Sequence, residues 1–575
     1  MPFARSNESL AMDPATATES TASSSSRMVP MAPTSTVAAL ASPSAEPPPV
    51  SGGKADDSVG RVAQPVLKAK KMPVAHAAVP QSSRVDALHL PTPVVESETR
   101  DRFPESALNP VYQVAERPVS TFSADVDTAS YSFVRRALNR GHLPSPDAVR
   151  VEEMINYFHY DYRKPTDAET PFTPTLALFP TPWNSNTHLL QIGIQGYEPS
   201  VESRPRSNLV FLLDVSGSMR SRDKLPLLKK SLRLLIGSLH PEDHVAIVVY
   251  AGAAGAVLEP TPVRERQRIL SALDNLRAGG STAGGAGIEL AYRLAEQNFS
   301  KDAVNRIILA TDGDFNVGVS NPRALKQLIA RKRQSGVFLS VLGFGQGNYN
   351  DRLMQTLAQN GNGTAAYIDT LNEARKLLVD EAAATLIPIA KDVKYQIEFN
   401  PDRVAEYRLI GYETRKLARE DFNNDAVDAG EIGSGHTVTA LYEITLTESE
   451  NRFVDPLRYG TASPREMNER DGGGNRELAF LKMRFKQPDG SRSRLITRAI
   501  TDADRIDLEA SGHEDQRFAA AVAALGQKLQ QSSHLHGFST QRILDLALSG
   551  KGEDPFGYRA EFTALVRMVQ ALERR

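Results

Sequence analysis

The stretch LVFLLDVSGSM, residues 209–219, decides how the rest of the chain is interpreted. Its first five residues are apolar without a break, which is typical of a parallel strand buried on both faces. Asp214, Ser216 and Ser218 follow at alternate positions, and Gly217 lets the loop bend sharply. In such a loop the three side chains can turn their oxygens toward one point. The stretch therefore predicts a buried strand that ends in a cluster of oxygen ligands.

Two further oxygen donors lie in loops that we expect at the same edge of the sheet. The glycine-rich segment 279–285 contains Thr282, and the predicted strand 306–310 is followed by Thr311 and Asp312. Ligand sites of open α/β sheets form at the carboxyl ends of the strands. Carboxylates and hydroxyls are hard ligands, which suit Mg²⁺, Mn²⁺ or Ca²⁺ rather than zinc. The predicted metal ligands are Asp214, Ser216, Ser218, Thr282 and Asp312.

Strands and helices alternate between residues 205 and 390, which predicts a doubly wound α/β domain with a mostly parallel sheet. A glycine-rich loop at 343–347 lacks the third glycine of a dinucleotide-binding motif, so we interpret it as structural. The expected strands are 209–213, 244–250, 306–310, 337–342 and 364–368, and the expected helices are 223–239, 264–276, 287–297, 322–335, 351–359 and a last one from 372.

Period-two patterns on both sides of this domain predict β-strands. Strands are expected within 172–197 before it and within 393–399, 438–446 and 481–500 after it. We predict that the two sets form one β-sandwich, with the α/β domain inserted between its strands. Helices are expected near the start of the folded region, at 133–138 and 149–158, and at the carboxyl end of the chain. Before the first of these helices, we interpret Asp125 and Asp127 as capping or turn residues rather than metal ligands.

The first hundred residues are rich in Ala, Ser, Thr and Pro, and such a composition buries too little apolar surface to offset chain entropy. We predict a disordered tail there. The expected domains are a disordered tail at 1–105, an N-terminal domain of helices and two strands at 106–204, the α/β domain at 205–390, a β-rich domain at 391–505 and a helical end at 506–575.

The motif set resembles the von Willebrand factor type A (VWA) domain, whose metal-ion-dependent adhesion site (MIDAS) pairs Asp-x-Ser-x-Ser with a distant Thr and a distant Asp. The resemblance implies that Ser216, Ser218 and Thr282 bind the cation directly or through water, and that Asp214 and Asp312 supply the charge. One coordination position would stay open for a carboxylate from a partner protein. A purely structural ion, with water in that position, is the alternative.

Three further segments extend the resemblance beyond this domain. Residues 122–158, 408–444 and 557–569 are similar to a bacterial VWA family with a characteristic N-terminal domain and a C-terminal domain of unknown function. Its members are often labelled calcium-activated chloride channel homologues. The resemblance implies the cell envelope or periplasm, although the sequence shows neither a signal peptide nor a cysteine for lipidation.

The amino-acid composition argues against a nucleic-acid-binding protein and against a membrane-spanning one. The 67 Lys and Arg against 69 Asp and Glu leave no basic excess for nucleic acid, and we identify no stretch apolar enough to span a membrane. We expect a cation-dependent protein-binding module rather than an enzyme, with Mg²⁺ (or Mn²⁺ or Ca²⁺) as cofactor. The expected partner is a protein that offers an Asp or Glu carboxylate. The alternatives are a scaffold for an ATPase partner and a metal-assisted hydrolase.

Overall fold

The computed structural model describes most of the chain beyond residue 100. The tail predicted to be disordered lies almost wholly outside the described residues, and so do Asp125 and Thr282. The described residues are 101, 103, 107–124, 127–200, 203–281, 284–313, 322–347, 349–455, 476–488, 490 and 492–574.

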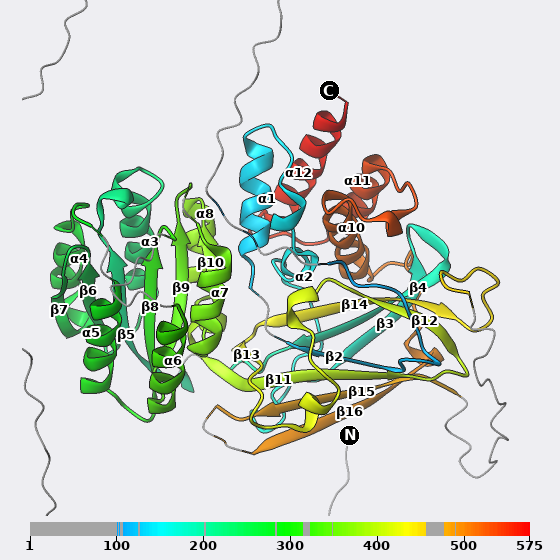
Figure 1. The fold of residues 1–575 in the computed structure, drawn as a ribbon, viewed down its shortest axis with the longest axis horizontal. Coiled ribbons are helices and arrows are strands. Elements are labelled where there is room, and N and C mark those ends of the chain that lie inside the picture. Colours follow the sequence, from blue (N-terminus) through cyan, green and yellow to red (C-terminus); the bar gives the residue numbers. More distant parts are fainter. Residues whose placement is uncertain are drawn as a thin grey trace, which may run out of the picture. The chain divides into compact units, whose positions relative to one another are not determined.

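The α/β domain is built on a six-stranded sheet in the order β10-β9-β8-β5-β6-β7 (Figure 1). The first five of these strands run parallel, and β7 pairs antiparallel with β6 at the edge. The apolar run at 209–213 lies in β5 and is fully buried, as the mostly parallel arrangement requires. The strands are β5 (Arg206–Asp214), β6 (His244–Tyr250), β7 (Ala254–Pro262), β8 (Ala303–Thr311), β9 (Phe338–Phe344) and β10 (Ala365–Ile368).

Helices cover both faces of this sheet and bury two separate hydrophobic cores. The last helix, expected to be continuous from residue 372, is interrupted by a π-helical segment at Lys376–Asp380, where the Glu381 amide bonds to the Lys376 carbonyl. One face carries α3 (Leu225–Ser238), α4 (Arg266–Asp274), α8 (Leu371–Arg375) and α9 (Ala382–Leu386), and the other carries α5 (Gly284–Gln297), α6 (Pro322–Lys332) and α7 (Asp351–Asn360).

Strands from both sides of the α/β domain form one β-sandwich, which confirms the predicted insertion. In the first sheet, β4 pairs antiparallel with β14 over eight residues, although the α/β domain separates them in the chain. The first sheet holds β1 (Tyr112–Gln113), β12 (Val404–Ile410), β14 (Thr437–Leu446), β4 (Asn184–Gln195) and β3 (Thr175–Thr181). The second holds β13 (Gly430–Gly433), β11 (Pro388–Phe399), β15 (Glu477–Lys486) and β16 (Ser493–Thr501), with β2 (Val119–Ser123) paired to β11.

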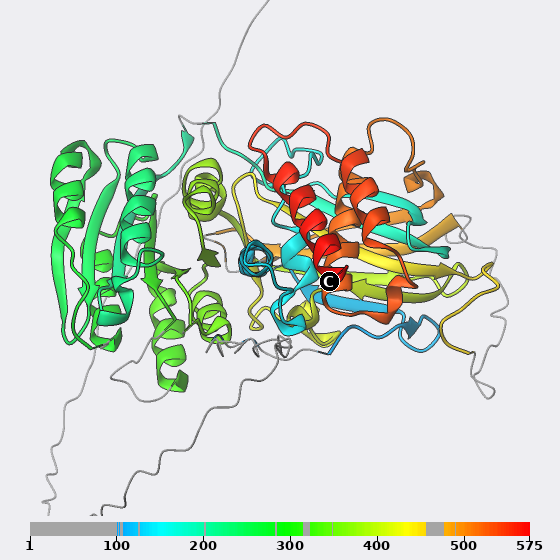
Figure 2. The ribbon, with the colours of Figure 1, turned by 90° about the horizontal axis from the view of Figure 1, so that it is seen from above.

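A layer of helices packs on the first sheet of the sandwich (Figure 2). The second helix is shorter than the expected 149–158, and just beyond its end the side-chain carboxamide of Asn156 bonds the backbone of Thr439 in β14. These helices are α1 (Ala129–Asn139), α2 (Val151–Ile155), α10 (Glu514–Leu529), α11 (Thr540–Ser549) and α12 (Tyr558–Glu573).

Helix α1 joins the α/β domain to the C-terminal helices. Its Arg135 is almost fully buried and pairs with Asp369 after β10, with Glu373 in α8 at 2.8 Å and with Glu561 in α12 at 3.0 Å. On the same helix, the Phe133 ring stacks on Tyr367 of β10 at 4.2 Å. One short helix is therefore held by two segments that are far apart in the sequence, residues 367–373 and α12.

Asp127, just before α1, has a different role from the one expected. Its carboxylate accepts hydrogen bonds from the Ala365 amide of β10 at 2.8 Å and from Arg415 at 2.7 Å. The side chain of the N-cap residue Thr128 makes no capping bond, and the Ser130 amide in the first turn of α1 donates to Glu153 at 2.9 Å. Asp127 thus links the α/β domain to the segment after β12, a role that the capping or turn interpretation did not include.

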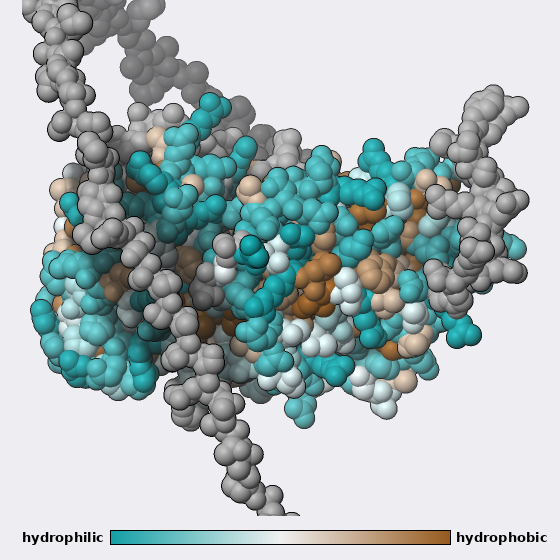
Figure 3. All heavy atoms as spheres, turned by 90° about the horizontal axis from the view of Figure 1, so that it is seen from below, coloured by the Kyte–Doolittle hydropathy of each residue, from teal (hydrophilic) through white to brown (hydrophobic). Residues whose placement is uncertain are grey.

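The face of the molecule drawn in Figure 3 is mostly hydrophilic, and its hydrophobic residues form separate patches. Within the described part of the chain, no helix combines the length and the apolar character that crossing a membrane requires.

Buried Glu152 in α2 makes folding stability depend on pH. Its Oε2 atom has no hydrogen-bond partner among the described residues, and burial, with Glu413 and Glu153 nearby, raises its pKa to about 8. The folded state therefore keeps a proton that the unfolded state releases above a pKa of 4.5. We expect stability to fall as pH rises from about 5 to about 8, by up to about 1.4 kcal/mol per pH unit.

Urea unfolding at about pH 5 and about pH 8 checks this expectation. Glu152→Gln removes the titrating group, so it is expected to flatten the pH dependence and to exceed the wild type in stability at the higher pH. The exposed Glu420→Gln serves as control and is expected to keep the wild-type slope. An unchanged slope in Glu152→Gln would place the proton elsewhere.

Candidate metal site at the carboxyl edge of the sheet

The loop after β5 turns its oxygens inward. Asp214 ends the strand with no exposed surface, and its Oδ1 atom accepts a hydrogen bond from the Ser216 amide at 2.8 Å. The hydroxyls of Ser216 and Ser218 lie 3.0 Å apart. Met219 buries the far end of the loop in the core below. The alternate spacing thus places one carboxylate and two hydroxyls in the same small region.

The glycine-rich loop is bonded directly to this first loop. The Gly217 amide donates to the Gly280 carbonyl at 3.0 Å, and the Gly279 amide donates to the Val215 carbonyl at 2.8 Å. Thr282 itself lies outside the described residues, but the chain on its two sides, Ser281 and the start of α5, is described. The backbone therefore brings the expected threonine loop beside the Asp-x-Ser-x-Ser loop.

Asp312 follows β8, the strand next to β5, and has no exposed surface. Its neighbour Thr311 donates a hydrogen bond to Oδ2 of Asp214 at 3.4 Å. The Oδ2 atom of Asp312 accepts a hydrogen bond from the Lys224 ammonium at 2.7 Å. The structure thus gathers four of the five expected ligands, Asp214, Ser216, Ser218 and Asp312, at one edge of the sheet.

Two buried carboxylates, Asp214 and Asp312, determine the electrostatics of this edge together with Lys224. Burial raises the pKa of Asp214 to about 6, the hydrogen bonds from Ser216 oppose the rise, and the charge of Asp312 adds to it. A divalent ion would relieve the cost of two carboxylates held together away from water. Among the described residues, no group of three or more His, Cys, Asp or Glu could hold a metal. The donors here are two carboxylates and hydroxyls, which fit Mg²⁺ better than a softer metal.

Sequence reasoning missed two residues of this site, Lys224 and Gly345. Lys224 lies just before α3 and reaches Asp312 from there. Gly345 belongs to the 343–347 loop, which was expected to be structural; its φ is 71°, and an added Cβ would lie 2.2 Å from Cγ of Lys224. The glycine pattern marked an unusual loop, but no signal in the sequence connected it to the lysine.

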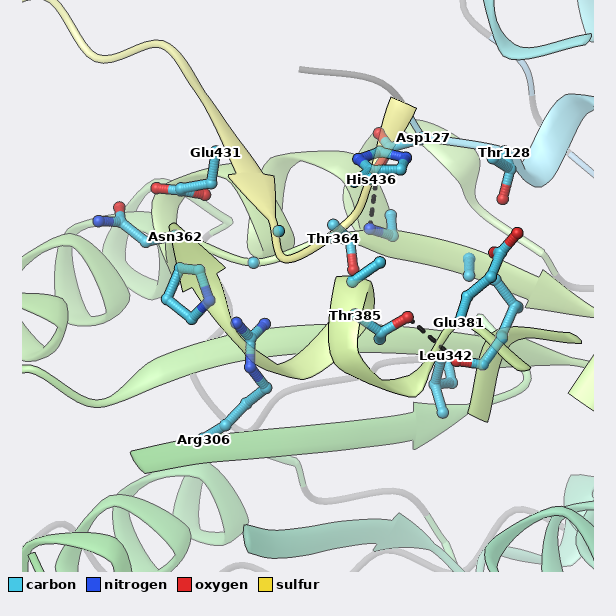
Figure 4. Close-up of a pocket in the computed structure, with 17 residues that line it drawn as sticks. Asp127, Thr128, Arg306, Leu342, Asn362, Thr364, Glu381, Thr385, Glu431 and His436 are labelled. Carbon is cyan, nitrogen blue, oxygen red and sulfur yellow. Dashed lines mark hydrogen bonds between the residues drawn. The ribbon is translucent and has the colours of Figure 1, made fainter. Parts of the chain in front are cut away.

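A cavity of about 60 Å³ lies where the α/β domain meets β11 and β13 (Figure 4). Arg306 of β8 points into it, and its burial lowers the pKa of the guanidinium to about 10, partly offset by Glu431. Burial also lowers the pKa of His436 to about 4. Two of the lining carboxylates, Asp127 and Glu381, are paired with the basic groups of Arg415 and Lys376.

This cavity is separate from the metal loops. Arg306 lies on β8 six positions before Asp312, which follows the strand, and six residues of extended chain span about 20 Å. Because Asp127 and Glu381 are held in ion pairs, they serve as structural contacts of this seam. The cluster of oxygen donors at the carboxyl edge of the sheet therefore remains the candidate functional site of the α/β domain.

Known families match three consecutive segments of the chain. Residues 97–191 match the family described as von Willebrand factor, and residues 208–380 match the von Willebrand factor type A domain. Residues 384–572 match the family described as Uncharacterized protein YfbK, C-terminal.

Similar proteins occur in Escherichia coli and in humans. The Uncharacterized protein YfbK of Escherichia coli (strain K12) is 45% identical over 498 residues, which are 86% of this chain and 84% of that protein. Human inter-alpha-trypsin inhibitor heavy chain H4 is 27% identical over 266 residues, 43% of this chain and 28% of that protein.

Among solved structures, the von Willebrand factor type A protein from Catenulispora acidiphila is 15% identical with a TM-score of 0.37, over 68% of this chain and 89% of that one. The chain therefore belongs to the YfbK family, with a von Willebrand factor type A domain followed by the C-terminal region of that family.

Proposed function

We propose that this protein binds a partner protein through a divalent cation held at the carboxyl edge of the VWA sheet. The observation that carries this proposal is the cluster of oxygens from buried Asp214, Asp312 and Ser216 and half-buried Ser218 at the ends of two adjacent strands. Each donor is positioned by backbone or strand geometry before any metal arrives. A preformed set of this kind lowers the ordering cost of binding.

The donor set leaves room for a ligand from outside. Mg²⁺ takes about six oxygen ligands in an octahedral arrangement and usually keeps several waters. Two carboxylates and the hydroxyls of Ser216, Ser218 and Thr282 provide at most five side chains. In the proposed function, Asp214 and Asp312 supply negative charge to the ion and the hydroxyls supply neutral oxygen ligands. A partner carboxylate then replaces a water at the remaining coordination position.

A metal titration of the full chain tests this proposal. Mg²⁺, Mn²⁺ and Ca²⁺ are titrated separately by calorimetry into the wild type, Asp214→Asn and Asp312→Asn. We expect saturable binding in the wild type and a loss of at least about 100-fold, or about 2.7 kcal/mol, in either variant, because each removes a buried ligand charge. The exposed Asp274→Asn is the control and is expected to bind as the wild type does.

The carboxylate step has its own readout. The Mg²⁺ titration is repeated in acetate and in chloride at equal ionic strength, and acetate is expected to tighten the apparent affinity, because the two ligands stabilise one complex. Saturable binding retained by Asp214→Asn would place the ion elsewhere. Equal affinities in acetate and chloride would favour a structural ion whose remaining positions stay with water.

A further inference from the structure

We propose that Lys224 is a tethered counter-cation of the metal site, which neutralises Asp312 when no metal is bound and competes with the divalent ion for that carboxylate. This inference rests on the proposed function, since it concerns the regulation of the same site. Lys224 thereby sets how tightly the metal is held. It also determines the charge that the loaded site presents to a ligand.

The contact itself is buried and direct. The Lys224 ammonium lies 2.7 Å from Oδ2 of Asp312, and the two side chains are 9% and 0% exposed. A buried lysine is held against its desolvation cost only by a partner of opposite charge. In this site the partner is one of the expected metal ligands, so the lysine and the divalent ion need the same carboxylate.

The lysine side chain packs closely against the neighbouring loop that contains Gly345. The Gly345 backbone, with φ at 71°, leaves no room for a Cβ beside the Lys224 carbons. The carbonyl of Gly345 accepts a hydrogen bond from the Tyr367 hydroxyl of β10, which fixes the loop from below. Lys230, farther along α3, is exposed to solvent instead. The position of the Lys224 side chain is therefore fixed by the surrounding fold.

Counting charges gives the consequence of this arrangement. Asp214, Asp312 and Lys224 together carry −1 when all three are ionised, and a divalent ion brings the site to +1. Without the lysine, the same site would pass from −2 to zero. The lysine thus reduces the repulsion between the two carboxylates in the metal-free protein. It weakens metal binding by like-charge repulsion, and it leaves the metal-bound site with a net positive charge that attracts a carboxylate.

Substitution of Lys224 in the full chain tests the inference. Lys224→Met removes the charge and keeps much of the stem, and Lys224→Gln keeps a hydrogen-bond donor without the charge. The exposed Lys230→Met is the matched control. Each protein is compared by its melting temperature in EDTA and in Mg²⁺, and by its Mg²⁺ dissociation constant from calorimetry.

We expect both Lys224 variants to melt lower than the wild type in EDTA, because two buried carboxylates lose their counter-charge. Their melting temperatures are expected to rise more on addition of Mg²⁺. Their Mg²⁺ affinity is expected to increase at least about tenfold, or about 1.4 kcal/mol. Lys230→Met is expected to follow the wild type in every measurement.

Two contrary results have different meanings. Equal or weaker Mg²⁺ binding in both Lys224 variants, with an equal or smaller rise in melting temperature, would overturn the counter-cation role and leave the metal site intact. No Mg²⁺ binding by the wild type or by either variant would instead overturn the proposed function itself.

Discussion

Replacing Arg150 by methionine is expected to destabilise the protein by about 3–5 kcal/mol. The Arg150 guanidinium is buried between the N-terminal helical segment and α7, where it donates to Asp351 at 2.9 and 3.1 Å and also pairs with Glu153. Asp351 has no exposed surface, and Glu153 is almost fully buried. Methionine would fill much of the space but leave both carboxylates without their cation, which is the costly way to break a buried ion pair.

A surface arginine offers the matched control. Arg233 pairs with Asp274 at 2.6 Å, and both side chains are about half exposed. Because exposed pairs contribute little, Arg233→Met is expected to change stability by less than about 1 kcal/mol. Chemical denaturation of the two variants measures the difference. Similar losses in both would mean that the Asp351 and Glu153 carboxylates find other partners or take up protons.

The change Gly433→Ala is expected to cost about 3 kcal/mol and to loosen the contact between β13 and α9. An added Cβ would lie 1.7 Å from the Ala384 carbonyl oxygen and 2.6 Å from its carbonyl carbon. These are backbone atoms of a helix, so they cannot rotate away as a flexible side chain would. Overpacking of this kind usually costs about 1–3 kcal/mol, and a backbone clash belongs at the upper end.

Gly255→Ala in β7 is the matched control, because it makes the same substitution at a position without a steric clash. A Cβ at Gly255 would meet no atom within 4 Å, so a change within about 0.5 kcal/mol is expected. Melting curves give both stabilities. Proteolysis can then report whether the segment around α9 opens first in Gly433→Ala. A variant as stable as the wild type would show that α9 shifts without cost.

Local sequence was sufficient to predict the frame of the fold. The apolar run at 209–213 and the alternation of strands and helices predicted the VWA sheet, because burial of a strand on both faces demands continuous apolar residues. The period-two strands on each side predicted the sandwich and the insertion between its strands. Asp214, Ser216 and Ser218 could be proposed as ligands because their spacing along one loop is a local property.

Other features escaped sequence reasoning because they depend on long-range contacts. Asp127 was interpreted as a capping or turn residue, and its carboxylate also contacts Ala365 and Arg415, which the interpretation did not foresee. The last VWA helix was expected to be continuous, but it contains a π-helical segment at Lys376–Asp380, and the Lys376 ammonium lies over the Tyr157 ring at 4.4 Å. The residues that Asp127 and Lys376 contact are distant in the chain, so the local sequence pattern does not indicate these contacts.

The sequence by itself determined the order of the elements, the pairing of the two strand sets and the oxygen donors of the candidate site. Only the tertiary structure decided which charges face one another: Lys224 with Asp312, Arg150 with Asp351, and Arg135 with three carboxylates. The physical reason is that periodicity records which face of an element is buried, whereas an ion pair depends on how two distant elements are placed in space.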